Sequence, residues 1–377
     1  MFDYDTLRVI WWLILGTLLI GFAVMDGFDL GVAAVFRFIG RTDDERRALL
    51  ASIEPVWDGN QVWFILGGGA VFAAWPVLYA TSFSGLYLAM LLLLFAFILR
   101  PVGFAYRNKI TDPRWRKTWD WAVFFGGTVP ALLCGVAFGN LFLGLPFHFD
   151  ELRRPVYTGG FFELLHPYAL LTGFVSVSML VMHGCTYAAL KVGEPMSGRA
   201  LALGRTAATT FIFAFVIAGV WVSVAMAGYR FDGGTLAGAG DAALNHVYVS
   251  QNGWLENYRV HSLLWLAPGG ALVFAFITWT FLGFGRPGAA FVSSSLTLAA
   301  TVLTAGFALF PFLMPSSEAY DDSLTVWNAS SSERTLGIML LAVVIFLPIV
   351  LAYTAWVFRV LRGRITLETV RAHNELY

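Results

Sequence analysis

Residues 336–358 read LGIMLLAVVIFLPIVLAYTAWVF, a stretch without a single charged side chain. A helix needs roughly 20 apolar residues to cross the hydrocarbon core of a bilayer, which is about 30 Å thick. This stretch is therefore long enough to span a membrane. The whole chain of 377 residues has the same character, because 58% of it is hydrophobic, only 13% is charged and its mean hydropathy is +0.71. Soluble domains are about 25% charged, so we expect an integral membrane protein.

Nine apolar stretches are long enough to span a bilayer, and we therefore expect an all-α, polytopic membrane protein with nine transmembrane helices. The second and third are separated only by Pro76, which predicts a tight turn there. The stretches cover residues 8–38, 50–75, 77–99, 119–143, 163–190, 204–229, 260–284, 289–314 and 336–358.

A weak internal repeat suggests how these helices are grouped. VMDG at Val24–Gly27 in the first stretch resembles VMHG at Val181–Gly184 in the fifth, and both stretches run in the same direction. Repeated helical units are common in polytopic membrane proteins. We therefore expect two four-helix bundles plus one extra helix, divided into residues 1–158, 159–314 and 315–377.

The charges are balanced in number but not in position. Lys and Arg total 24, as do Asp and Glu, so a basic nucleic-acid surface is excluded for the chain as a whole. Of the 24 basic residues, 18 lie near one set of helix ends and only 6 near the other. By the positive-inside rule, the N-terminus is expected outside and the C-terminus in the cytoplasm of a bacterial inner membrane.

Four carboxylates lie inside or near the first two expected spans. Asp26 precedes Arg37 by 11 residues and Asp58 follows Arg47 by 11, which places both acids about 16 Å from the basic loop at 1.5 Å per residue. Asp29 and Glu54 are expected on the same helix faces as Asp26 and Asp58. Ionisable groups at membrane depth are costly and are candidates for proton relays. A static polar network that binds helices together is the alternative interpretation.

Other polar and aromatic residues accompany these acids. Asn60 and Gln61 form a polar cluster with Glu54 and Asp58, whereas the flanking tryptophans suit a membrane interface. Arg100 is expected to end the third span, where it and the basic loop behind it either set the topology or dock an acidic partner or anionic lipid. The two tryptophans that flank Asn60 and Gln61 are Trp57 and Trp63.

The sequence does not predict a metal or haem site of its own. Of the six histidines only His183 lies deep in a span, and one histidine does not establish haem ligation. The CxxCH, Walker A and HExxH motifs are missing from the sequence.

Six short motifs, in their order along the chain, resemble subunit II of cytochrome bd-type quinol oxidases, with the cyanide-insensitive branch as a possible subtype. The segment EPVWDGNQVW is the most specific of them. They are GFDLG at 27–31, EPVWDGNQVW at 54–63, RP at 100–101, GVAFGN at 135–140, MHG at 182–184 and LFPFLMP at 309–315.

The resemblance implies a haem-free subunit of a terminal oxidase that oxidises quinol and reduces dioxygen to water. Two b-type haems and one d-type haem would be ligated by subunit I, the partner. Asp26 and Asp58 would feed protons toward the haem site, with Asp29 and Glu54 on the same path, and Trp63 would lie where dioxygen enters. Trp57, Arg100 and His183 would have structural or partner-contact roles. The resemblance leaves open a small single-helix accessory subunit, a bound quinone and bound lipid.

Two other functions remain open from the residues alone. Acids at depth and a helical repeat also suit a proton-coupled secondary transporter. A purely structural assembly subunit would instead tolerate neutral replacements of Asp26 and Asp58.

Overall fold

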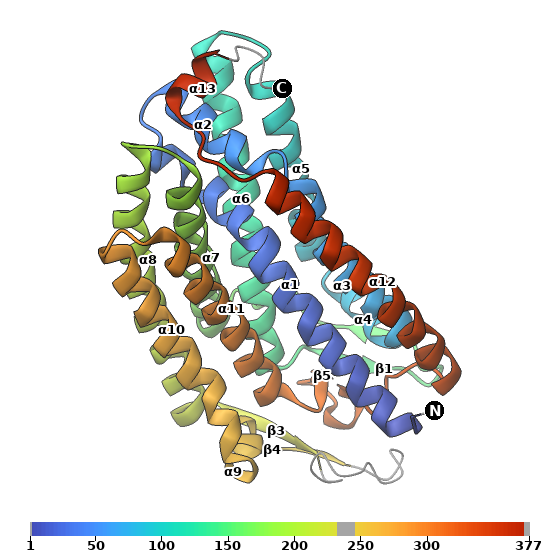
Figure 1. The fold of residues 1–377 in the computed structure, drawn as a ribbon. Coiled ribbons are helices and arrows are strands. Elements are labelled where there is room, and N and C mark those ends of the chain that lie inside the picture. Colours follow the sequence, from blue (N-terminus) through green and yellow to red (C-terminus); the bar gives the residue numbers. More distant parts are fainter. Residues whose placement is uncertain (1, 232–245, 373–377) are drawn as a thin grey trace.

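The structure is a computed structural model that describes residues 2–231 and 246–372. Long helices lie side by side and run between two ends of the molecule (Figure 1). These helices are α1 (Tyr4–Ile39), α3 (Trp57–Ala74), α5 (Tyr87–Arg107), α6 (Pro113–Leu143), α7 (Pro167–Lys191), α8 (Met196–Val224), α10 (Leu266–Gly283), α11 (Pro287–Leu309) and α12 (Glu333–Val360).

Short elements cover the two ends. At one end three antiparallel pairs of strands lie near the start of α1, and at the other α2 and α13 lie across the helix ends (Figure 1). The short helices are α2 (Asp43–Ile53), α4 (Pro76–Gly85), α9 (Glu256–Val260) and α13 (Leu367–Ala372). The strand pairs are β1 (Phe147–Phe149) with β2 (Pro155–Tyr157), β3 (Ala227–Phe231) with β4 (Val247–Gln251), and β5 (Phe312–Met314) with β6 (Leu324–Thr325).

The expected all-α membrane architecture is confirmed. Within the described residues, eight helices are long and apolar enough to cross a membrane, and a ninth span is formed if α3 and α4 are counted together. The turn expected at Pro76 is present, because α4 is bent by 119° from α3 at this point. Proline lacks an N–H donor and disfavours helix at the residue before it, and Trp75 accordingly leaves the helical conformation.

Three expected boundaries around the second and third spans are wrong. The residues before Trp57 form α2, a separate polar helix, so the second crossing begins at α3 rather than at Leu50. The third crossing is α5, which starts at Tyr87 and continues through Pro101 to Arg107. Arg100 consequently lies within a helix instead of ending one.

Helix α1 is the centre of the fold. It packs against α3 and α6 in the first half of the chain and against α7 and α11 in the second. Within the second half, α7, α8, α10 and α11 form a closed ring of contacts, while α12 packs on α1 and α3. A Cβ atom at Gly31 would overlap the Leu180 carbonyl oxygen, and one at Gly184 would overlap the backbone of Gly31. Glycines therefore allow the close contact of α1 with α7.

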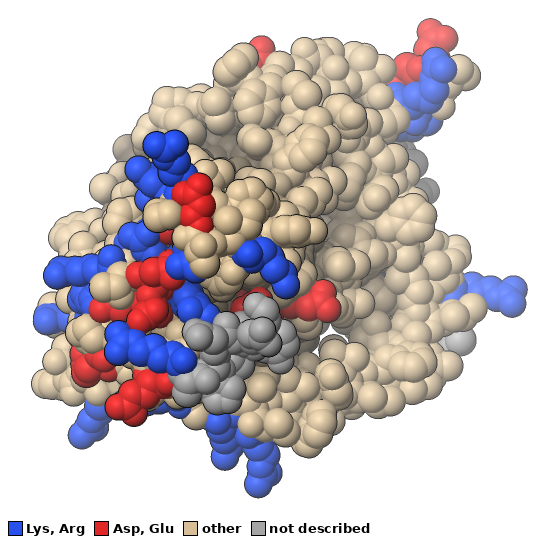
Figure 2. Space-filling model, turned by 90° about the horizontal axis from the view of Figure 1, so that it is seen from above, with Lys and Arg blue, Asp and Glu red and all other residues tan. Residues whose placement is uncertain are grey.

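The end of the molecule that carries α2 and α13 is called the basic end below. It includes the ends of α1, α5 and α7 and the beginnings of α6 and α8 (Figure 1). Figure 2 views the molecule from this end and shows Lys and Arg gathered with Asp and Glu on one side of the face. The charges that the sequence places near one set of helix ends therefore cluster in space as well.

Candidate functional site

A fully buried ion pair joins α1 to α5. Arg100 Nη2 donates to Asp26 Oδ1 at 2.7 Å, and both side chains have 0% exposure. The pairing leaves Asp26 Oδ2 and the Arg100 Nε and Nη1 atoms buried without a hydrogen-bond partner among the described residues. Buried polar groups in proteins are nearly always satisfied by protein or water. These three atoms are therefore available to bond water or a polar group of another subunit.

A second buried hydrogen bond lies one helical turn away on α1. Asn60 Nδ2, from α3, donates to Asp29 Oδ2 at 2.8 Å, and Asp29 Oδ1 is buried with no partner among the residues that the structure describes. Asp29 has 0% exposure and Asn60 has 2%. We call Asp26, Asp29, Asn60 and Arg100 the buried polar cluster. It contains two carboxyl groups and only one cation, so full ionisation would leave one negative charge uncompensated.

Arg100 is the residue of this cluster that sequence reasoning misplaced. It was expected at a helix end facing a basic loop, but six more residues of α5 separate it from Arg107. That continuation, PVGFAY, carries no charge. An arginine followed by almost two uncharged helical turns is a signal that it lies inside the membrane and needs a buried carboxylate.

The four expected acids do not form one ladder. Asp26 and Asp29 share the buried polar cluster, whereas Asp58 is exposed on the first turn of α3 and Glu54 lies in the turn after α2. Glu54 and Asp58 do not share a helix face, because the helix is broken between them. Gln61 is only half-buried on α3. Of the four predicted acids, the structure thus brings Asp26 and Asp29 together and leaves Glu54 and Asp58 apart from them.

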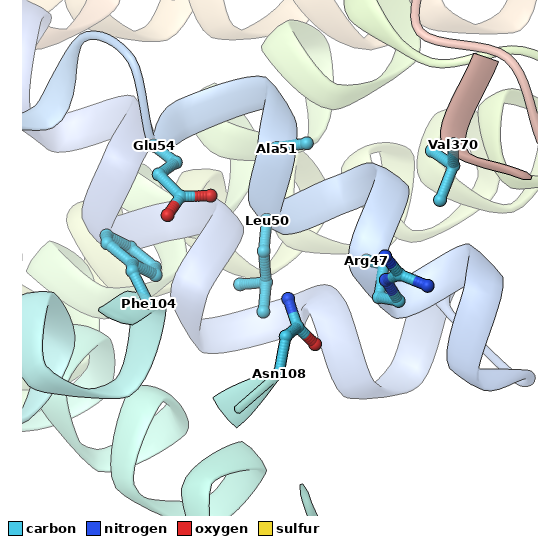
Figure 3. Close-up of a pocket in the computed structure, with 7 residues that line it drawn as sticks. All are labelled: Arg47, Leu50, Ala51, Glu54, Phe104, Asn108 and Val370. Atoms are coloured by element: carbon cyan, nitrogen blue, oxygen red, sulfur yellow. The ribbon is translucent and has the colours of Figure 1, made fainter. Parts of the chain in front are cut away.

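Glu54 lines a small pocket at the basic end (Figure 3). Its carboxyl group points toward the space between Phe104 and Leu50, and Val370 of α13 closes another side. The pocket has room for about one water molecule. Burial raises the pKa of Glu54, which lies outside the membrane-spanning helices, to about 7. At neutral pH this group can both take up and release a proton.

The two tryptophans have different surroundings. Trp63 is only 7% exposed and its ring lies against Gly21 of α1, where a Cβ atom would overlap it. Trp63 is therefore a core residue rather than part of an interfacial belt. Trp57 is half-buried, and its ring centroid lies 6.2 Å from that of Phe104 beside the Glu54 pocket.

His183 is held by this chain through both ring nitrogens. Nε2 lies 3.0 Å from the Val24 carbonyl oxygen and Nδ1 lies 2.7 Å from Ser294 Oγ. The ring also stacks on Phe291, with centroids 4.8 Å apart. A carbonyl oxygen can only accept, so Nε2 is the donor. His183 thus joins α7 to α1 and α11 and has no nitrogen free for an iron atom. His373 lies outside the described residues.

The family model described as "Cytochrome bd terminal oxidase subunit II" matches residues 7–361. The chain belongs to this family. It is 48% identical to cytochrome bd-I ubiquinol oxidase subunit 2 of Escherichia coli K12, over 100% of both chains. It is 31% identical to cytochrome bd ubiquinol oxidase subunit 2 of Bacillus subtilis, over 96% of this chain and 97% of the relative.

A solved structure shows the same fold. The bd oxidase from Geobacillus thermodenitrificans aligns with a TM-score of 0.71 at 15% identity, covering 94% of this chain and 98% of its own. The resemblance found in the sequence is thereby confirmed. The protein is a membrane subunit of a bd-type quinol:oxygen oxidoreductase and has a partner subunit. The comparisons give no support for a secondary transporter.

Proposed function

We propose that subunit II carries protons from the basic end into the membrane, toward the partner subunit. The observation that supports this most directly is the buried polar cluster, with its two carboxyl groups, one guanidinium and four polar atoms that lack partners among the described residues. Reduction of dioxygen to water consumes protons, and titratable side chains are the usual route for protons through a membrane.

The proposed path begins at Glu54 and reaches Asp29 and Asp26. Glu54 lies in a pocket at the basic end and titrates near neutral pH. Arg100 neutralises Asp26, whereas the one hydrogen-bond partner of the Asp29 carboxyl group within the described part of the chain is the neutral Asn60. An isolated buried charge is costly, so Asp29 is the natural holder of a proton. Water bound to the four unpartnered atoms would join Asp29 to Asp26.

Asp58 lies outside the buried polar cluster, on the surface of the subunit. It is exposed on α3, and no ion pair involves it within the described chain. A carboxylate on the surface of a membrane helix needs a polar partner. We propose that Asp58 meets the partner subunit and transfers protons across that contact. Gln61 lies three residues further along α3 and would extend the polar contact.

We also propose how the chain is oriented in the membrane and how its helices divide into bundles. The excess of basic residues supports an orientation with the basic end and α13 in the cytoplasm and the start of α1 outside. The first bundle would cover residues 1–158, the second 159–314, and the ninth helix with its tail 315–377. Dioxygen would enter near Trp63, which lies in the core between α3 and α1.

The haem groups of the oxidase are proposed to lie in the partner. Among the described residues, His183, which lies deep in a span, does not fit a haem ligand, because both of its ring nitrogens are occupied by Val24 and Ser294. Two b-type haems and one d-type haem, bound by subunit I, would supply electron transfer and dioxygen reduction. Quinol would be the electron donor, and a bound quinone or a small accessory subunit would be compatible with this arrangement.

Neutral replacement of the acids tests the proposal. Asp26→Asn and Asp58→Asn should each slow quinol oxidation by about tenfold or more, as expected for loss of a proton-transfer group. Charge separation by the reconstituted two-subunit complex should fall in parallel, while the haem spectrum stays normal in Asp58→Asn, whose acid makes no ion pair with a described residue. Asp44→Asn, an acid of α2 at the basic end outside the cluster, is the matched control. Normal turnover with normal charge separation in Asp58→Asn would refute the path. Loss of haem from the complex would instead support a purely structural role.

A further inference from the structure

A second polar site lies at the basic end, apart from the buried polar cluster. A cavity of about 410 Å³ opens between the end of α1, the beginning of α2 and the first turns of α6. Charged side chains gather on part of the basic end (Figure 2). The charged residues that line the cavity are Arg37, Asp43, Arg46, Arg116, Lys117 and Asp120.

The cavity wall carries more positive than negative charge. Its four basic residues face only Asp43 and Asp120, and both acids are also bonded by Arg107 behind them. Asp120 accepts from Arg107 Nε at 2.6 Å and Arg46 Nη1 at 2.8 Å. Asp43 accepts from Arg107 Nη2 at 2.8 Å and Arg116 Nη1 at 2.7 Å. Each oxygen of these two carboxylates already accepts one such bond, and the cavity lining still has four cations against two acids.

Donors for a further anion are available. The guanidinium groups of Arg37 and Arg116 line the cavity, and their Nε atoms are buried without a hydrogen-bond partner among the described residues, so the Nη atoms are the ones to meet an anion. Lys117 is exposed and makes no ion pair with any described residue. Guanidinium and ammonium groups in this arrangement suit the oxygens of a phosphate.

An apolar aromatic surface continues from the cavity along the membrane-spanning helices. The Arg37 guanidinium lies 3.6 Å from the centroid of Trp121, which stacks on Phe125 one turn further along α6. Phe38, at the end of α1, contacts Phe124 of α6. Trp121, Phe125 and Phe38 are 42%, 47% and 65% exposed. Cationic groups at the helix ends thus lie directly beside a surface suited to acyl chains.

We propose that this site binds an anionic phospholipid. The phosphate would occupy the cavity between Arg37, Arg116 and Lys117, and the acyl chains would cover Trp121 and Phe125. Basic pockets between membrane helices are a known form of anionic-lipid recognition. A lipid whose headgroup also carries a quaternary ammonium group would place that cation against an already positive wall. Phosphatidylglycerol and related acidic lipids therefore fit better than phosphatidylcholine.

The test uses the purified two-subunit complex in detergent, after removal of bound lipid. Binding of dioleoyl-phosphatidylglycerol is measured by native mass spectrometry for the wild type, Lys117→Gln and the double variant Arg37→Gln/Lys117→Gln. Binding should weaken several-fold in the single variant and at least about tenfold in the double variant, equal to about 1.4 kcal/mol. Arg362→Gln, an exposed arginine at the same end but outside the cavity, should bind as the wild type does.

Three further measurements test the proposal: binding of a second lipid, competition by inorganic phosphate and retention of subunit I. Dioleoyl-phosphatidylcholine should bind much more weakly than phosphatidylglycerol, and inorganic phosphate at millimolar concentration should not displace the lipid. Equal binding by the wild type and both variants would overturn the proposal, as would equal binding of the two lipids. Displacement by inorganic phosphate would show a simple anion site. Loss of subunit I from the Lys117→Gln complex would show that the surface contacts the partner protein instead. Because Lys117 is exposed, its replacement should leave folding intact.

Discussion

Arg100 Nη2 donates to Asp26 Oδ1 at 2.7 Å, and neither side chain has any exposed surface. The bond joins α1, the central helix, to α5 in the middle of the expected membrane depth. A buried ion pair is weak evidence for stability, because both charges lose their hydration. Its two members are nevertheless interdependent, since removing one leaves the other charged and buried. The first prediction follows from this dependence.

Arg100→Gln should destabilise the complex more than the double variant Asp26→Asn/Arg100→Gln. The single replacement leaves the Asp26 carboxylate without its cation, at a cost of about 3–5 kcal/mol, and the second removes that charge. The thermal midpoint of the purified complex, followed by loss of the haem spectrum, checks this. Equal midpoints for the single and double variants would contradict the interdependence.

Gly31→Ala should disrupt the contact between α1 and α7. Its new methyl group would overlap the Leu180 carbonyl oxygen, a backbone atom that cannot move aside on its own. Overpacking of this kind costs about 1–3 kcal/mol, so we expect a lower thermal midpoint and a lower yield of complex. Gly16→Ala is the control on the same helix, because nothing lies within 4 Å of a Cβ atom there. Equal midpoints for the two variants would argue against close packing at Gly31.

Glu54 should make stability depend on pH between its two pKa values. Burial raises the pKa of Glu54 in the folded protein to about 7, against 4.5 in an unfolded chain. The folded state therefore binds the proton more tightly, and stability falls as pH rises from about 4.5 to about 7. Glu54→Gln removes this loss of stability at high pH. The difference in thermal midpoint between Glu54→Gln and the wild type should therefore be more positive at pH 8 than at pH 5. Glu368→Gln, an exposed carboxyl at the same end, should show the same difference at both pH values.

The Glu45–Arg199 pair should have the opposite dependence on pH. Arg199 donates to Glu45 Oε1 at 2.7 Å and to Oε2 at 3.0 Å, which ties α2 to α8. These bonds lower the pKa of Glu45 below 4.5, so the stabilisation is present above pH 4.5 and is lost as pH falls through the folded pKa. Arg199→Gln should cost about 1–3 kcal/mol at pH 7 and clearly less below pH 4.

Glu45→Gln is the complementary variant for this pair. Glu45→Gln should remove the loss of stability that the pair shows as pH falls. It should retain the hydrogen bond from Arg199 to the Ile39 carbonyl oxygen. A midpoint difference between wild type and Arg199→Gln that does not change between pH 7 and pH 4 would show that the ion pair contributes nothing. In that case the carbonyl bond alone would account for the role of Arg199.

Much of the architecture could be predicted because membrane helices have a strong local signal. A run such as residues 336–358 has to be a helix in a bilayer, since every backbone N–H and C=O must be bonded within the segment. Motifs such as EPVWDGNQVW at residues 54–63 likewise identified the family correctly. The boundary at Trp57 was missed because Leu49, Leu50 and Ile53 of α2 continue the apolar pattern toward α3, although Pro55 between the two helices is a local signal for the break.

The sequence by itself determined the membrane class, the number of spans, the family and the identity of Asp26 and Asp29 as unusual acids. Tertiary structure alone decided which partners these acids have. Arg100 lies 74 residues from Asp26 and Asn60 lies 31 from Asp29, so no helical spacing relates them. Whether Asp58 points inward or outward depends on how α3 is rotated against α1. That rotation is set by contacts such as Trp63 against Gly21, which involve both helices at once and cannot be read from either one.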